Sequence, residues 1–193
     1  DLRTSRGLGD VYKRQSISAG YGINKKDNWV YLMQQKFYEE GNSIKLINSS
    51  VSGDTTGGGL GRLAKNLKKF DPDFVLIELG GNDALRGYSI KLIKSNLEKM
   101  IALIKQNKSK VLLMQIRIPP NYGQKYMLAF EKIYKDLALS KEVYLIPFML
   151  EEIGINSELM QPDGIHPNKK AQSLIAKDVK KNIDKFLLIN QSN

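Results

Sequence analysis

The residues best suited to acid–base chemistry lie near the end of the chain, in residues 161–168 (QPDGIHPN). His166 is the only histidine among 193 residues, so any imidazole chemistry must use it. Asp163 stands three residues earlier, and Gly164 with two prolines disfavours a helix or strand. We therefore expect a surface loop in which Asp163 accepts the Nδ1 proton of His166, so that Nε2 can take a proton from a hydroxyl. The alternative is a solvated loop histidine beside the start of a helix.

Composition narrows the classes of protein. Hydrophobic residues form 41% and charged residues 26% of the sequence, as is ordinary for a soluble globular protein of one domain. Cysteine is absent, which excludes disulfides and thiolate metal sites. No apolar run reaches the length of a membrane span, and no signal peptide is visible. The net charge of +10 comes from lysines spread over every expected helix, so solvated helix faces are favoured over a nucleic-acid footprint.

Two other kinds of site receive little support. Gly57, Gly59 and Gly61 suggest a nucleotide-binding loop, but Arg62 stands where GxGxxG needs its last glycine, and no Gly-Lys-Ser/Thr occurs. A single histidine without cysteine is a poor basis for a metal site.

Helical and strand patterns alternate along the chain. The first expected helix spans residues 27–40, with Asp27 as its cap and Gly41 as its stop. The buried faces of the five expected helices are Trp29, Leu32, Met33 and Phe37; Leu60, Leu63, Leu67 and Phe70; Leu92, Ile93, Leu97, Met100, Ile101 and Ile104; Met127, Phe130, Tyr134 and Leu137; and Ala171, Leu174, Ile175, Val179, Ile183 and Phe186. The expected strands are 44–47, 74–79, 111–116 and 143–146.

This alternation predicts an α/β fold with a parallel sheet covered by helices on both sides. In such folds the loops that leave the carboxyl ends of strands build the ligand crevice. Three of these loops are small and polar, namely residues 49–56, 80–83 and 117–123. We expect the histidine loop to join them at the same edge.

Ordered sequence blocks along most of the chain resemble the SGNH (GDSL-type) serine hydrolases, and within them the bacterial branch of acyl-CoA thioesterases, lysophospholipases and arylesterases. The blocks are Ser16-Ile17-Ser18-Ala19-Gly20-Tyr21, Ser52-Gly53-Asp54-Thr55, Glu78-Leu79-Gly80-Gly81-Asn82-Asp83 with Leu85-Arg86-Gly87, Met114-Gln115-Ile116-Arg117, Pro120-Asn121-Tyr122-Gly123 and Asp163-Gly164-Ile165-His166-Pro167. Each block alone is a weak signal, whereas their order and spacing together are specific. The resemblance implies a three-layer α/β/α fold with a five-stranded sheet of order 2-1-3-4-5.

The resemblance also assigns roles to particular residues. Ser16 becomes the nucleophile, His166 the general base and Asp163 its orienting partner. The oxyanion hole comes from the backbone N–H groups of Ser16 and Gly53 and from the side-chain amide of Asn82. The acyl pocket is expected near Leu85, Pro120 and Tyr122.

The chemistry of these side chains agrees with those roles. A serine hydroxyl is a poor nucleophile until a base takes its proton. Gly53 has no Cβ to block a substrate, and Asn82 is a neutral donor. Each residue also has a plainer interpretation, with Gly53 as a turn glycine and Asn82-Asp83 as a common end to a strand, and Ser16 by itself carries little weight.

The resemblance further implies an acyl ester or thioester as substrate. It implies no cofactor, no metal, no nucleic acid, no stable membrane insertion and a monomer. The expected location is periplasmic or secreted, with the cytoplasm as the alternative.

The chain departs from the family pattern before Ser16. Arg14-Gln15-Ser16-Ile17 replaces the family's Gly-Asp-Ser-Leu, and the preceding residues are basic where a hydrophobic first strand is expected. Lys13 and Arg14 would then approach a buried position, where an unpaired charge costs several kcal/mol. We therefore expect residues 1–15 to be a non-native segment and residues 16–193 to form a single hydrolase domain. The missing signal peptide is accordingly no evidence for the cytoplasm.

Three classes of function remain open. The favoured one is an active esterase or thioesterase on acyl chains. A carbohydrate-ester deacetylase on the same scaffold is disfavoured by Leu85-Arg86-Gly87 and Pro120-Asn121-Tyr122-Gly123, which follow the acyl-hydrolase branch. The third is an acyl-binding protein whose nucleophile is misplaced by the altered segment before Ser16.

Overall fold

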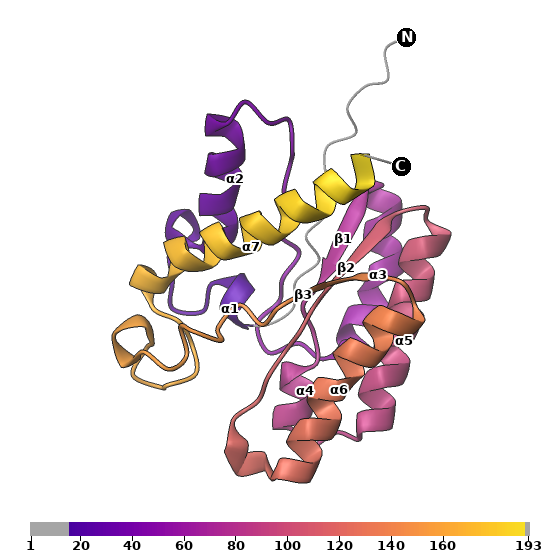
Figure 1. The fold of residues 1–193 in the computed structure, drawn as a ribbon, viewed down its shortest axis with the longest axis vertical. Helices are drawn as coiled ribbons and strands as arrows, with labels where there is room; N and C mark the ends of the chain where they lie inside the picture. Colours follow the sequence, from indigo (N-terminus) through magenta and orange to yellow (C-terminus); the bar gives the residue numbers. More distant parts are fainter. Residues whose placement is uncertain (1–15, 192–193) are drawn as a thin grey trace.

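A computed structural model describes residues 16–191, in which helices alternate with parallel strands. Within these residues the sheet has the order β1-β2-β3 (Figure 1). Strand β1 (Phe74–Ile77) pairs with β2 (Lys110–Met114), and β2 pairs with β3 (Tyr144–Ile146), both in parallel. The predicted α/β fold with a parallel sheet is confirmed.

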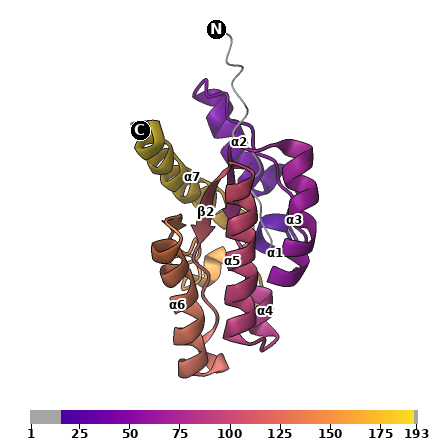
Figure 2. The same cartoon turned by 90° about the vertical axis from the view of Figure 1, so that its right-hand side faces the viewer.

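Helices cover both faces of this sheet (Figures 1 and 2). On one face α5 (Ile90–Gln106) and α6 (Gln124–Ser140) pack against β2, and α3 (Thr56–Phe70) lies beside α5. On the other face α7 (Lys169–Gln191) contacts β3 and packs along α2 (Trp29–Glu39). All four residues of β1 are buried as a result, as its unbroken apolar sequence predicts.

Short helical turns lie between the longer elements and carry several of the residues with predicted roles. They are α1 (Ser16–Ala19), η1 (Lys25–Asp27), α4 (Gly81–Leu85), η2 (Pro120–Tyr122) and η3 (Ser157–Leu159). The expected turn 80–83 is therefore helical from Gly81 onward, because α4 begins almost directly after β1.

The predicted count of five strands is not confirmed. Within the described residues, 44–47 form no strand. The side chain of Gln34 binds one edge of this extended segment. Its Nε2 donates to the carbonyl of Ile44 over 2.8 Å, and its Oε1 accepts the N–H of Leu46 over 2.6 Å. The expected first strand, and the whole segment 1–15 that we predict to be non-native, lie outside the described residues.

Smaller corrections concern helix caps and faces. Asn28, not Asp27, caps α2, since its Oδ1 accepts the N–H of Val30 over 2.9 Å. Asp27 ends η1 and pairs with Lys169 over 3.0 Å. Leu92 and Leu174 were expected to be buried but are each 47% exposed, because each lies at the border of its helix's apolar face.

Candidate active site

The loop between η3 and α7 holds Asp163 and His166 in contact. One carboxylate oxygen of Asp163 accepts the backbone N–H groups of Ile165 (2.9 Å) and His166 (3.0 Å). The other lies 2.7 Å from Nδ1 of the His166 ring. Gly164 allows the tight turn between them by adopting a φ of +67°. The loop and the contact of the two side chains are as the sequence predicts.

These hydrogen bonds fix the electrostatic state of the pair. The backbone N–H and then the side chain of His166 lower the pKa of Asp163 from 3.8 to about 2, so the carboxylate is ionised near neutral pH. An ionised carboxylate can only accept a hydrogen bond, so Nδ1 must be the donor. In the neutral ring Nε2 is then the basic nitrogen, as a general base requires.

The helical turn α1, which begins at Ser16, is anchored to the core. The Ser18 hydroxyl donates to Glu78, which is fully buried at the end of β1. The Ser18 carbonyl accepts from the side-chain amides of Asn48 (2.9 Å) and Asn28 (3.3 Å). The backbone of Ser16 is thereby held at the edge of the sheet, whereas its side chain lies outside the described part of the chain.

Gly53 and Asn82, the other two predicted oxyanion-hole residues, are linked through one residue. Gly53 adopts a φ of +75°, which favours glycine, and its carbonyl accepts from Arg86 over 3.0 Å. The side-chain amide of Asn82 donates one hydrogen to the carbonyl of Asp54 over 3.0 Å. The bond orients the Asn82 amide beside the Gly53 turn and leaves its second hydrogen available.

Asp83, immediately after Asn82, is a supporting residue that the sequence analysis did not assign. It is completely buried and accepts the backbone N–H of Thr56 (2.8 Å) and the Thr56 hydroxyl. Asn96 donates to the same hydroxyl over 3.0 Å. Burial raises the pKa of Asp83, although its hydrogen bonds to Thr56 oppose the rise. The side chain thus fastens the first turn of α3 to α4.

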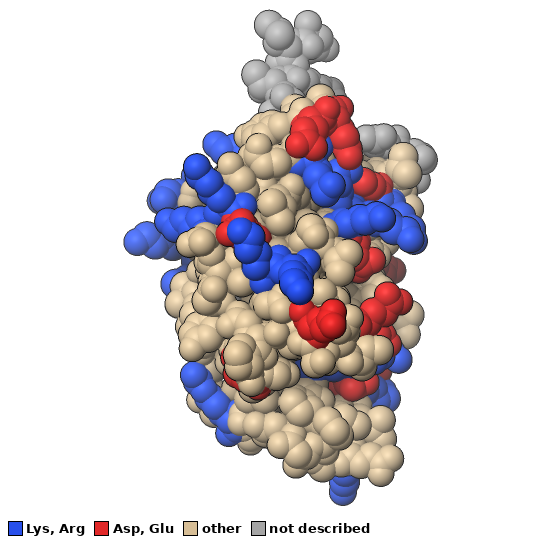
Figure 3. Space-filling model, turned by 90° about the vertical axis from the view of Figure 1, so that its left-hand side faces the viewer, with Lys and Arg blue, Asp and Glu red and all other residues tan. Residues whose placement is uncertain are grey.

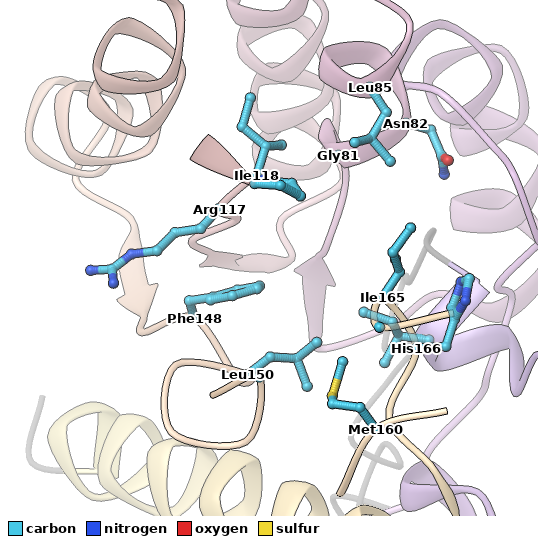
Figure 4. Close-up of a pocket in the computed structure, with 14 residues that line it drawn as sticks. Gly81, Asn82, Leu85, Arg117, Ile118, Phe148, Leu150, Met160, Ile165 and His166 are labelled. Atoms are coloured by element: carbon cyan, nitrogen blue, oxygen red, sulfur yellow. The ribbon is translucent and has the colours of Figure 1, made fainter. Parts of the chain in front are cut away.

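An apolar cavity of about 340 Å³ opens beside His166 and Asn82 (Figure 4). Its lining residues come from the carboxyl edge of the sheet and from the irregular segment before α7; they are Ile17, Gly81, Asn82, Leu85, Arg117, Ile118, Pro119, Phe148, Leu150, Gly154, Met160, Gly164, Ile165 and His166. Figure 4 shows His166 and Asn82 on the same side of the cavity, while the Arg117 head group points away from it. Arg117 pairs there with Glu151 over 2.8 Å and with Glu131 over 3.8 Å.

The predicted pocket residues are only partly brought together. Leu85 lines the cavity, whereas Pro120 and Tyr122 do not, and Pro119 stands in their place. The Tyr122 hydroxyl donates to the carbonyl of Leu85 over 3.3 Å, so it supports the wall from behind. Sequence reasoning missed Phe148 and Met160 because they lie in irregular segments whose apolar residues follow no helix or strand period.

A parallel sheet with an Asp–His pair, a positioned side-chain amide and an apolar cavity at its carboxyl edge is an arrangement suited to an acyl hydrolase. Comparison with known proteins supports this class. The model of the GDSL-like Lipase/Acylhydrolase family matches residues 15–174, and the chain belongs to this family.

Similar proteins include enzymes named for ester and thioester hydrolysis. An arylesterase from Vibrio mimicus is 48% identical over 172 residues, which are 89% of this chain and 86% of that protein. Thioesterase 1/protease 1/lysophospholipase L1 from Escherichia coli (strain K12) is 43% identical over 161 residues, 83% of this chain and 76% of that protein. Among solved structures, the psychrotrophic esterase EstA from Pseudoalteromonas sp. matches with a TM-score of 0.88 and 39% identity, covering 92% of this chain and 99% of EstA.

Proposed function

We propose that this protein is a serine hydrolase that cleaves carboxylic esters and thioesters of acyl chains through an acyl-enzyme intermediate. The observation that carries the proposal is the His166 ring, held by Asp163 at an apolar cavity that Asn82 also lines. The family membership and the names of the relatives agree with this reaction.

Each proposed catalytic group has one task. Nε2 of His166 takes the proton of the Ser16 hydroxyl as its oxygen attacks the acyl carbon, and Asp163 stabilises the imidazolium that forms. The imidazolium then protonates the leaving alcohol or thiol as the bond to the acyl carbon breaks. A water molecule, deprotonated by the same nitrogen, releases the acid and restores Ser16.

The negative oxygen of each tetrahedral intermediate is assigned to the N–H groups of Ser16 and Gly53 and to the Asn82 amide. Asn82 is suited to this task because its hydrogen bond to the Asp54 carbonyl uses only one of its two amide hydrogens. One such donor contributes about 3 to 4 kcal/mol to the stabilisation of the transition state.

The acyl chain is assigned to the cavity because most of its lining is apolar. Leu85, Ile118 and Phe148 form one part of the lining, and Met160 and Ile165 form another. A straight hydrocarbon chain would be removed from water there without leaving polar groups unpaired. Among the lining residues, Leu85 and Pro119 replace the predicted set of Leu85, Pro120 and Tyr122.

Several finer features remain proposals that rest on the family resemblance. They are a five-stranded sheet of order 2-1-3-4-5, a monomeric state and a periplasmic or secreted location. No helix in residues 16–191 is long and apolar enough to cross a membrane. On the face shown in Figure 3 the basic side chains are interspersed with acidic ones, which supports the proposal that nucleic acid is not the partner.

The test is hydrolysis of a short-chain p-nitrophenyl ester by the 193-residue chain and by its Ser16→Ala variant. We expect turnover that Ser16→Ala abolishes and that Ser140→Ala, a change at an exposed serine at the end of α6, leaves intact. A further variant replaces residues 1–15 with an apolar strand ending in Gly-Asp. Tight binding of an acyl ligand without turnover in any version would contradict the proposal and favour a binding protein.

A further inference from the structure

His166 is held not only by Asp163 but also by the segment that follows α1. The ring of Tyr21 lies against the imidazole, with their centres 4.7 Å apart and their planes tilted by 36°. Tyr21 is 55% exposed and is not part of the hydrophobic core. Its ring packs against the His166 imidazole instead. The residue stands five positions after Ser16, in the same sequence block.

Gln161 joins the two loops through its side chain. Its Nε2 donates one hydrogen to the carbonyl of Tyr21 (3.0 Å) and the other to the carbonyl of Pro167 (3.1 Å). Both amide hydrogens are therefore used, one on each side of the gap between the loops. The Pro167 carbonyl belongs to the residue directly after His166, so the bond fixes the backbone beside the imidazole.

The backbone of Gln161 holds the same turn from within. Its N–H donates to the carbonyl of His166 over 2.7 Å, and its carbonyl accepts the N–H of Gly164 over 2.9 Å. Gln161 thus contacts the histidine loop through both backbone and side chain. A shift of its side chain would move the Tyr21 segment and the His166 loop apart.

The close approach of Gly22 shows that this junction has little spare room. A Cβ added at Gly22 would lie 2.8 Å from Oε1 of Gln161, and the φ of +67° at this position disfavours any side chain. A side chain at this position would have to displace the Gln161 amide and would strain the backbone, so glycine is favoured here. The close approach shows that the Gln161 amide lies directly beside the segment that follows α1.

We propose that Gln161 and Tyr21 form a clamp that sets the position of the His166 imidazole relative to the segment that carries Ser16. Both act as positioning residues: Gln161 sets the distance between the two loops, and the Tyr21 ring limits the tilt of the imidazole. The hydrogen bond between Ser18 and Glu78 already holds α1 in place. The clamp therefore holds the histidine loop at a set distance from α1. The inference rests on the proposed roles of Ser16 and His166.

The decisive variant is Gln161→Glu, which keeps the size of the side chain but replaces two donors by an oxygen that repels both carbonyls. We expect kcat to fall about 10- to 100-fold with KM changed less than about twofold, since small misplacements of catalytic groups have effects of this size. Gln106→Glu, the same change at an exposed residue at the end of α5, is the matched control and keeps wild-type kcat.

Tyr21 is tested separately by removing and then restoring the ring. Tyr21→Ala is expected to lower kcat about tenfold, whereas Tyr21→Phe keeps the ring and recovers most of that loss. Tyr38→Ala removes a tyrosine of similar exposure, 58%, from α2 and serves as the control. The rate at which a phosphonate ester modifies Ser16 gives a second readout, because it follows activation of the nucleophile without acyl-chain binding.

The outcomes separate the clamp from the proposed function. Loss of kcat and of phosphonylation rate in folded Gln161→Glu and Tyr21→Ala supports the clamp. Unchanged kcat in both, or a change confined to KM, overturns it. If Gln161→Glu does not fold, Gly22→Ala and Tyr21→Ala carry the same test. A wild-type chain that hydrolyses no ester and accepts no phosphonate contradicts the proposed function instead.

Discussion

Asp83 and Asp163 are two carboxylates that each support a proposed catalytic side chain, and their surroundings move their pKa values in opposite directions. Asp83 is completely buried, and loss of water raises its pKa even though Thr56 donates two hydrogen bonds. The side chain of Asp163 is 38% exposed, and the N–H groups around it lower its pKa to about 2. In Asp83 the loss of water outweighs the hydrogen bonds from Thr56, whereas in Asp163 the hydrogen bonds from His166 and Ile165 outweigh the small loss of water.

The opposite pKa shifts of Asp163 and Asp83 correspond to different roles of the two carboxylates. Asp163 keeps a full negative charge beside an imidazole that must become positive during the reaction. Asp83 touches no group that changes charge, and it fastens α3 to α4, the element that carries Asn82. We therefore assign the first carboxylate to the reaction and the second to the framework. The following changes test that division.

Asp163→Asn has the largest expected effect. An amide in place of the carboxylate removes the charge that stabilises the imidazolium and no longer selects the Nδ1–H tautomer. We expect kcat to fall about 10³- to 10⁴-fold while the fold stays intact. Steady-state hydrolysis of a p-nitrophenyl ester measures the loss, and Asp178→Asn at an exposed position of α7 is the control. Turnover close to wild type would remove Asp163 from the mechanism.

Asp83→Asn is expected to affect stability first and the reaction second. The amide nitrogen would face a Thr56 donor, and a buried donor left unsatisfied costs about 1 to 3 kcal/mol in the free energy of unfolding. A shift of α4 would also displace Asn82, so we expect kcat to fall about tenfold. Urea unfolding and ester hydrolysis measure the two effects. An unchanged free energy of unfolding would show that the buried bonds to Thr56 contribute nothing.

The pH dependence of stability should show the smallest effect, with opposite signs for the two carboxylates. The folded pKa of Asp163 lies below the unfolded value of 3.8, so its contribution is present above pH 3.8 and is lost as the pH falls toward about 2. The folded pKa of Asp83 is raised above 3.8, so its contribution is present below that pH and is lost as the pH rises.

Urea unfolding of the wild type and both Asn variants between about pH 2.5 and 7 tests these signs. Subtracting the Asp163→Asn curve from the wild-type curve should leave a difference that grows with pH in the acid range. The same subtraction for Asp83→Asn should leave a difference that declines with rising pH. If the free energy of unfolding of the wild type and of both variants changed with pH in parallel, the opposite signs assigned to Asp163 and Asp83 would be contradicted.

The parts of this site that the sequence predicts are those formed by neighbours along the chain. Asp163 and His166 are three residues apart, and the glycine and prolines around them leave few conformations other than a loop. The buried strands β1 and β2 are equally local, since an apolar run of this length carries its own signal. Gly53 and Asn82 were assigned only through the family resemblance, because nothing in their own segments shows that Asp54 brings them together.

The features of the site and fold that the sequence does not predict depend on contacts between segments far apart in the chain. Burial of Asp83 goes together with its hydrogen bonds to Thr56 at the start of α3, a contact that its neighbours in the sequence do not show. The cavity wall at Phe148 and Met160 lies in irregular chain that has no periodicity. The strand predicted at residues 44–47 is not formed within the described residues, and the sequence gives no sign that the Gln34 side chain binds one edge of this segment.

The most direct test of the central claim, that Ser16 is the nucleophile activated by the Asp163–His166 pair, is mass spectrometry of the protein after reaction with a phosphonate ester. We predict a single adduct that peptide mapping places on Ser16, formed much more slowly in Asp163→Asn and absent in Ser16→Ala. An adduct on another residue, or ester hydrolysis that continues in Ser16→Ala, would contradict the account.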